Sequence, residues 1–231
     1  MEDNVTSTKN DIRQLLTTLK DKTQQPFLLV GGSSLILHGS HRVTNDIDLL
    51  VPRDAVNEFS AAKEAVLNET EHKHVEKIDL LNAIADRFDF ESIKFYTSDI
   101  GGFRVPDLDV MLGSKVLSHY LRADGEEGDA KRSSDLDDIN WISKELQKRG
   151  LKVKKDVSDK LVCGPYNMLL VVADLHMTFG DEGLKAFESV GGREFECDWG
   201  TEEFREQVEL YEIEVEESEY AKILESHRRS S

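Results

Sequence analysis

Two aspartates stand two positions apart in an otherwise apolar segment, Asp46-Ile47-Asp48-Leu49-Leu50. Successive side chains of a β-strand point to opposite faces, so both carboxylates face one way while Ile47 and Leu49 face the core. Carboxylates this close repel each other unless a cation lies between them, and oxygen ligands of this kind are those that Mg²⁺ prefers. The spacing therefore predicts a divalent metal site on one face of a strand.

A glycine turn precedes the aspartates. Gly31 and Gly32 follow the apolar run FLLV, and Ser33 and Ser34 open a short apolar segment. Small residues at the start of a helix let backbone N–H groups and hydroxyls approach a phosphate, and the helix dipole favours its negative charge. A phosphate-binding turn followed closely by a metal site predicts a nucleotide-binding site.

These residues need strands and helices to position them. Apolar periodicity favours strands within residues 27–32 and 46–52, a strand that begins in 75–84, and helices over 9–22, 33–39 and 53–68. A hairpin over 92–106 turns near Gly101 and Gly102, and helices over 107–121 and 133–149 flank the polar segment 123–132. Beyond a linker-like segment at 150–160, we expect helices over 166–179, 181–190 and 201–225.

The composition is that of a globular protein, with 231 residues of which 39% are hydrophobic. The net charge of −17 repels a phosphate backbone, so we expect no broad nucleic-acid interface, although tRNA stays open as an acceptor. Cys163 and Cys197 have no zinc or disulfide-framework spacing. We see no signal peptide and no apolar run that could span a bilayer, so we expect a cytoplasmic protein without membrane contact.

The segment VGGSSLILHGSHRVTNDIDLLV resembles the DNA polymerase β-like nucleotidyltransferase superfamily, because Gly-Gly, Arg-x-Thr and Asp-x-Asp occur there in order. It is most similar to the minimal, abortive-infection-toxin (AbiEii-like) branch, which includes fungal stand-alone members, and it is also similar to antibiotic-modifying adenylyltransferases. The resemblance covers residues 11 to 145. It implies an α+β fold with a mixed sheet flanked by helices, and transfer of a nucleoside monophosphate from an NTP to an acceptor hydroxyl.

The family holds two metal ions with three carboxylates, so the resemblance implies Mg²⁺ or Mn²⁺ with the NTP. Asp46 and Asp48 match two of the ligands. Asp79, in the segment Lys-Ile-Asp-Leu-Leu, is the expected third, with Asp89 and Asp109 as rivals.

The resemblance also assigns the nucleotide-binding residues. The turn contributes Gly31, Gly32, Ser33 and Ser34, and the segment before the aspartates contributes Arg42 and Thr44. Later matches are Lys115, Lys131, Arg132 and Asp135, where the cations would clamp the phosphates.

We expect a nucleotidyltransferase domain over residues 1–155 and an acidic, mostly helical extension over 156–231. The predicted activity is metal-dependent nucleotidyl transfer to a hydroxyl of a small molecule, a protein or an RNA end. The alternative is an inactive nucleotidyltransferase fold that binds a nucleotide or a protein, with the acidic extension as the partner surface.

Overall fold

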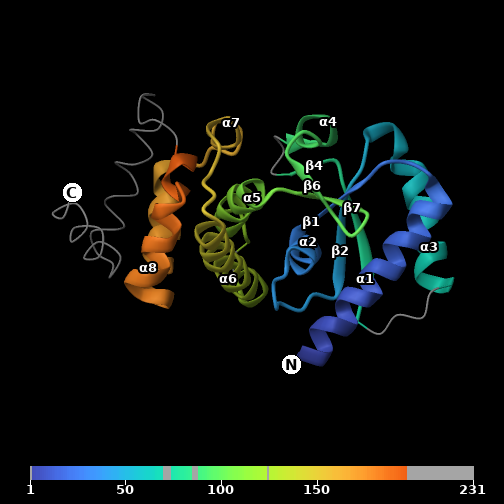
Figure 1. Ribbon diagram of the computed structural model, residues 1–231, viewed down its shortest axis with the longest axis horizontal. Coiled ribbons are helices and arrows are strands. Elements are labelled where there is room, and N and C mark those ends of the chain that lie inside the picture. Colours follow the sequence, from blue (N-terminus) through green and yellow to red (C-terminus); the bar gives the residue numbers. More distant parts are fainter. Residues whose placement is uncertain (1, 70–73, 85–87, 124, 197–231) are drawn as a thin grey trace. The chain divides into compact units, whose positions relative to one another are not determined.

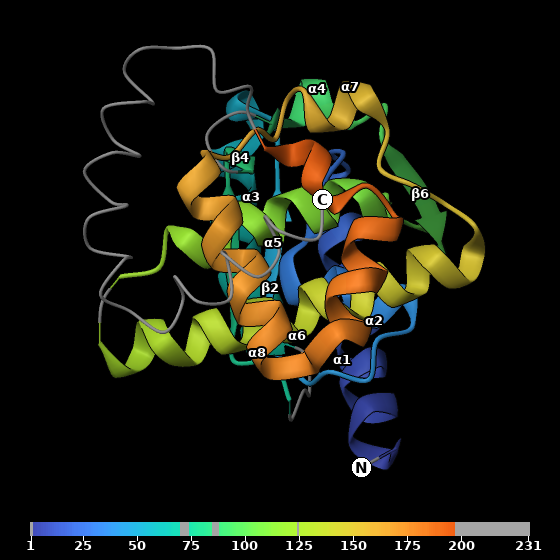
Figure 2. The ribbon, with the colours of Figure 1, turned by 90° about the vertical axis from the view of Figure 1, so that its left-hand side faces the viewer.

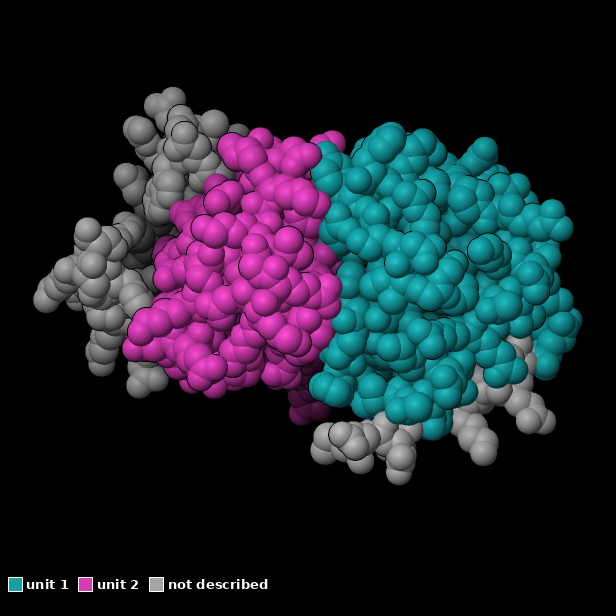
Figure 3. Space-filling view, viewed as in Figure 1, with its two compact units in different colours: residues 1–107 teal, residues 108–231 magenta. Residues whose placement is uncertain are grey.

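The computed structural model describes residues 2–69, 74–84, 88–123 and 125–196. The chain divides into two compact units, residues 1–107 and 108–231 (Figure 3). The division predicted from the sequence, after residue 155, rests on a change of composition near residues 150–160 and stays a prediction. The predicted acidic helix at 201–225 lies outside the described residues.

The first unit is built around a three-stranded sheet in the order β1-β2-β3 (Figure 1). Its sheet strands are β1 (Leu28–Val30), β2 (Asp46–Leu50) and β3 (Lys77–Leu81). Its other strands are β4 (Ala83–Ile84), β5 (Phe88–Asp89), β6 (Thr97–Ile100) and β7 (Phe103–Pro106). Its helices are α1 (Glu2–Thr23), α2 (Gly31–His38), η1 (Arg53–Ala55), α3 (Val56–Glu69) and α4 (Phe90–Ile93).

The sheet is mixed. β1 runs antiparallel to β2, and β2 runs parallel to β3. The segments β4–β5 and β6–β7 form separate antiparallel pairs, the second being the predicted hairpin around Gly101 and Gly102. The predicted fold class, a mixed sheet flanked by helices, is thereby confirmed.

Burial explains which face of β2 is free for chemistry. Ile47 and Leu49 are fully buried in a core that includes Ile12 of α1 and Phe59 of α3. Because side chains alternate along a strand, Asp46 and Asp48 emerge on the other face. The helices therefore fix both the position of the strand and the direction of its carboxylates.

The second unit is helical over its described residues. It contains α5 (Leu108–Tyr120), α6 (Glu126–Arg149), α7 (Lys155–Ser158), α8 (Pro165–Ser189) and η2 (Gly192–Phe195). The three long helices α5, α6 and α8 pack against one another (Figure 2). A left-handed residue, Gly180 with φ +64°, interrupts α8 and separates the two helices that the sequence predicts there.

Two predictions for this unit need correction. The polar segment 123–132 is not wholly a connection, because α6 begins at Glu126. Its first turn carries Glu126, Glu127 and Asp129, whose charges favour a helix N-terminus. The segment 150–160 is more than a linker, since it forms α7 and buries Val153 and Val157. Within the described ranges, no helix has the length and hydropathy that a bilayer span requires.

Candidate metal and nucleotide site

Three carboxylates converge on the free face of the sheet. Parallel pairing sets Asp48 of β2 opposite Asp79 of β3, while Asp46 lies at the start of β2. One carboxylate oxygen of each of these half-buried residues lies within 4.8 Å of the other two. Such a set of hard oxygen atoms fits Mg²⁺ or Mn²⁺, and repulsion within it would be relieved by a divalent cation. Asp79 is thus the third-carboxylate candidate that the structure brings to Asp46 and Asp48.

The two rival candidates have other contacts. Asp89 caps α4, because its carboxylate accepts a hydrogen bond of 2.9 Å from the backbone N–H of Ser92. Asp109 belongs to the second unit and is 3% exposed. Its carboxylate accepts bonds from the backbone N–H groups of Val110 at 3.0 Å and Lys154 at 3.3 Å. These contacts account for both residues without a metal.

The carboxylate of Asp46 is oriented by the predicted residue Thr44. The Thr44 hydroxyl, which is buried, donates a short hydrogen bond to Oδ1 of Asp46. A carboxylate held by a neighbouring hydroxyl keeps one orientation toward a bound metal ion. Removing such a supporting contact commonly lowers metal affinity by about 10- to 100-fold. Thr44 therefore contacts a carboxylate of the candidate site, and its predicted contact with the nucleotide stays a prediction.

Other side chains lie so close to both glycines of the turn that neither position has room for a Cβ atom. Gly31 has φ +62°, and a Cβ there would lie 2.0 Å from Oδ2 of Asp48. A Cβ on Gly32 would lie 2.7 Å from the guanidinium carbon of Arg42. The missing side chains thus let the Asp48 carboxylate and the Arg42 guanidinium lie directly against the first turn of α2. One face of the turn meets a carboxylate of the candidate metal site, and the other meets the guanidinium of Arg42.

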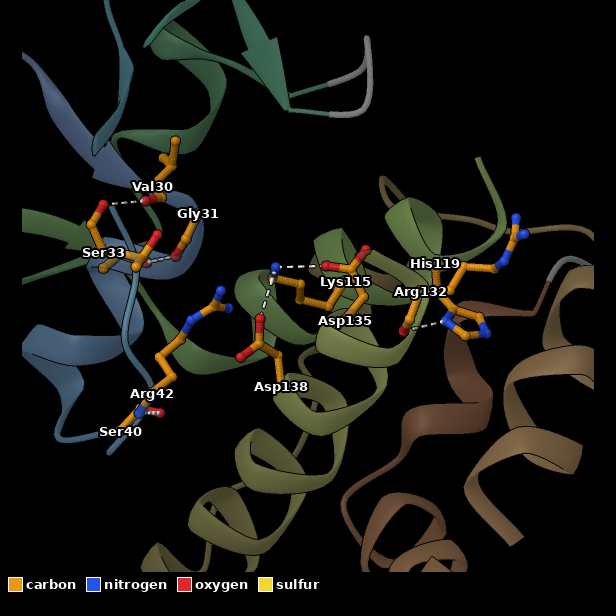
Figure 4. Close-up of polar contacts among 12 residues, drawn as sticks. Val30, Gly31, Ser33, Ser40, Arg42, Lys115, His119, Arg132, Asp135 and Asp138 are labelled. Carbon is orange, nitrogen blue, oxygen red and sulfur yellow. Dashed lines mark hydrogen bonds and ion pairs between the residues drawn. The ribbon is translucent and has the colours of Figure 1, made fainter. Parts of the chain in front are cut away.

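The two serines of the turn make local contacts. Ser33 donates to the carbonyl oxygen of Val30 at 3.1 Å (Figure 4), and Ser34 donates to that of Gly31 at 2.8 Å. Both residues are fully buried. The Ser33 hydroxyl links α2 to the last residue of β1, and the Ser34 hydroxyl bonds within the first turn of α2. The predicted contact of both serines with phosphate stays a prediction.

Lys77 was not singled out from the sequence, although it stands two positions before Asp79 and therefore shares its face. Its ammonium lies 2.6 Å from Oδ2 of Asp79. The pKa of Lys77 is raised, chiefly by its hydrogen bond and attraction to Asp79, with smaller contributions from Asp46 and Asp48. All three carboxylates therefore contribute to a negative electrostatic potential at the Lys77 ammonium.

In the second unit, Lys115 forms a buried ion-pair cluster. Its ammonium lies 2.7 Å from Asp135 and 2.8 Å from Asp138 (Figure 4), and Arg122 lies 2.7 Å from the other oxygen of Asp135. Burial alone would raise the pKa of Asp135, but Lys115 and Arg122 outweigh it and hold that pKa below its ordinary value. The cluster ties α5 to α6, and the predicted contacts of Lys115 and Asp135 with phosphate stay predictions.

The remaining predicted cations, Lys131 and Arg132, lie on α6. Lys131 pairs with Glu127 one turn earlier, at 2.6 Å on the exposed surface. Arg132 pairs with Asp129 and donates to the carbonyl oxygen of Arg122 at 3.0 Å. Nothing in these contacts assigns either residue to a phosphate, and their predicted role stays a prediction.

A family model and a solved structure are each similar to part of this chain. Residues 14–122 match the family model described as "Nucleotidyl transferase AbiEii toxin, Type IV TA system". A solved structure, that of the antibiotic-resistance factor ANT(2'')-Ia, is 18% identical with a TM-score of 0.37, and the likeness covers 62% of this chain and 93% of that chain. No curated protein matches. The family match confirms the resemblance and the enzyme class predicted from the sequence, because residues 14–122 match a nucleotidyltransferase model of the AbiEii type.

Proposed function

We propose that this chain is a metal-dependent nucleotidyltransferase, which moves a nucleoside monophosphate from ATP or GTP to an acceptor hydroxyl. The observation that carries the proposal is the parallel register of β2 and β3. It adds Asp79 to Asp46 and Asp48 and completes a set of three carboxylates within 4.8 Å of one another.

Asp46, Asp48 and Asp79 would hold divalent cations, Mg²⁺ or Mn²⁺. When bound, such cations supply charge neutralisation for the triphosphate and lower the pKa of the acceptor hydroxyl. Two ions are expected with the NTP, as in the family that the sequence resembles.

The residues of the turn contribute positioning. The first turn of α2 presents backbone N–H groups and the positive end of a helix dipole to a phosphate. Arg42, which lies against Gly32, adds a planar cation whose geometry suits phosphate oxygens. Together they would place the α-phosphate for attack, so that positioning and charge stabilisation supply most of the rate.

The transfer balances without a further reactant. The acceptor oxygen forms a bond to the α-phosphorus while the bond from that phosphorus to the pyrophosphate oxygen breaks, and pyrophosphate leaves. The proton of the acceptor hydroxyl passes to a carboxylate, for which we assign Asp79, and from there to water.

One observation favours a second function, a nucleotide-binding module without catalysis. The ammonium of Lys77 lies 2.6 Å from Asp79 and supplies a positive charge beside the carboxylates. If that charge replaces a metal, the nucleotide would bind without transfer. The two functions therefore differ in their dependence on divalent cations.

Calorimetric titration of ATP and of GTP, with and without Mg²⁺, tests the proposal on the full chain. The test variant is Asp46→Asn/Asp48→Asn, and Asp21→Asn, an exposed aspartate of α1, is the matched control. We expect metal-dependent binding in the native chain and in the control, and none in the double variant. If the double variant bound the nucleotide as tightly as the native chain, these aspartates would have no part in nucleotide binding and the proposal would be refuted. Nucleotide binding by the native chain without Mg²⁺ would favour the second function.

A further inference from the structure

A hollow of about 250 Å³ opens in the first unit where β2 and β3 end. Val51 and Asn82, which line it, each come three residues after an aspartate of the metal site, Asp48 and Asp79. At about 3.3 Å per residue the hollow therefore begins about 10 Å along the strands from the carboxylates. Ligands of sheets with parallel strands commonly bind beyond the carboxyl ends of those strands, as here.

The walls are partly apolar. Val51 is fully buried, Phe90 is 7% exposed and Pro52 is half-buried, and all three line the hollow. The volume falls below the roughly 300 Å³ at which pockets for drug-sized ligands begin. The hollow is thus too small for a whole nucleoside triphosphate, and it suits a molecule with one short apolar group.

Some polar residues of the hollow have partners within the protein, and others have none among the described residues. Glu91 forms an ion pair with Lys94, and Asp89 caps α4 through the N–H of Ser92. Arg53, Asp54 and Asn82 also line the hollow. All three are exposed, and none of their side chains has a hydrogen bond or ion pair with a residue that the structure describes. A ligand would therefore meet one cation, one anion and one amide that no side chain of the described residues engages.

Charge complementarity narrows the chemical class of the ligand. A phosphate would face the carboxylates of Asp54, Asp89 and Glu91, and like charges repel. A simple amine would pair with a carboxylate but would leave the guanidinium of Arg53 without an anion. A neutral heterocycle would partly desolvate Arg53 and Asp54 without supplying either with an opposite charge, which is costly. A small zwitterion gives each of the two charges a partner.

We propose that this hollow binds a free α-amino acid with an apolar side chain. Its carboxylate pairs with Arg53, its ammonium pairs with Asp54, and its side chain packs against Val51, Pro52 and Phe90. Asn82 donates to the carboxylate or accepts from the ammonium. The site shares no residue with the metal site, so it stands whether or not the chain transfers nucleotides.

The test uses L-leucine as the probe in an NMR titration of the full chain at millimolar concentrations. Two ligands remove one charge each and keep the apolar group: 3-methylbutylamine lacks the carboxylate, and 4-methylpentanoate lacks the ammonium. Each analogue loses one charge-assisted hydrogen bond, so each should bind about tenfold more weakly than L-leucine. Saturable L-leucine binding with this ranking supports the proposal.

Substitutions of residues in the hollow test whether L-leucine binds there. Arg53→Gln and Asp54→Asn should each weaken L-leucine binding about tenfold, whereas Asp21→Asn and Asp46→Asn/Asp48→Asn should leave it unchanged. Circular dichroism of each variant establishes that it is folded. Absence of saturable L-leucine binding, equal binding of either analogue, or native affinity in both Arg53→Gln and Asp54→Asn would each overturn the proposal.

Discussion

Replacing Gly31 by alanine tests whether the turn is shaped by the metal ligand. The new Cβ would lie 2.0 Å from Oδ2 of Asp48, well inside van der Waals contact, so the carboxylate must move by more than about 1 Å. A misplacement of about 1 Å can cost about 100-fold in rate. The residue also has φ +62°, where an alanine costs about 1–2 kcal/mol. We therefore expect a modest loss of stability and a large loss of metal affinity and transfer.

Gly39 provides the matched control. It follows the same helix α2, has φ +107°, and a Cβ there would meet no atom within 4 Å. Gly39→Ala therefore imposes backbone strain without displacing a side chain. Both variants should lower the free energy of unfolding by about 1–2 kcal/mol, whereas Gly31→Ala alone should lose metal affinity.

Two measurements separate these effects. Urea unfolding gives the change in the free energy of unfolding, and titration with Mn²⁺ gives metal affinity for the native chain and both variants. If Gly31→Ala bound Mn²⁺ as tightly as Gly39→Ala, the contact between the turn and Asp48 would have no part in metal binding, and the reasoning above would be refuted.

Three further substitutions test the polar contacts of Thr44, Lys115 and Asp135. Thr44→Val removes the hydroxyl that holds Asp46 and should weaken Mn²⁺ binding about tenfold in the same titration; unchanged affinity would contradict this role. Lys115→Met leaves buried carboxylates without their ammonium and should lower the free energy of unfolding by about 3–5 kcal/mol, whereas the exposed Lys131→Met should change it by less than about 0.5 kcal/mol; similar losses would refute the burial argument. Asp135 has a depressed pKa in the folded state, so it contributes stability above its unfolded pKa of about 3.9 that is lost as the pH falls through the lower folded pKa. Urea unfolding at a series of pH values should show a shallower acid loss for Asp135→Asn than for the native chain, and equal slopes would count against this assignment.

The sequence predicted the parts of the site that depend on local pattern. Alternation along β2 places Asp46 and Asp48 on the free face, and the glycine turn begins a helix as expected. The convergence of Asp79 with them follows from the pairing of β3 with β2, a non-local contact that the family resemblance suggested but the residues alone did not.

Other features depend on contacts that no local pattern reveals. The ion pairs of Lys115 with Asp135 and Asp138 join two helices, and the predicted contact of Lys115 with phosphate stays a prediction. Ser33 and Ser34 bond to carbonyl oxygens whose position depends on how β1 joins α2. The early start of α6 reflects acidic residues in its first turn, a signal present in the sequence but outweighed in the prediction by the neighbouring glycines.

The pairing of Asp48 with Asp79 has a consequence for folding. Side chains along a strand repeat every two residues, so a slip of β3 by one residue would turn Asp79 toward the core and bring an apolar neighbour to the metal face. A cation that requires all three carboxylates can bind the correct register and not the slipped one. Ligation stabilises the state that binds, by mass action, so divalent cations should bias this unit toward its native strand register during folding.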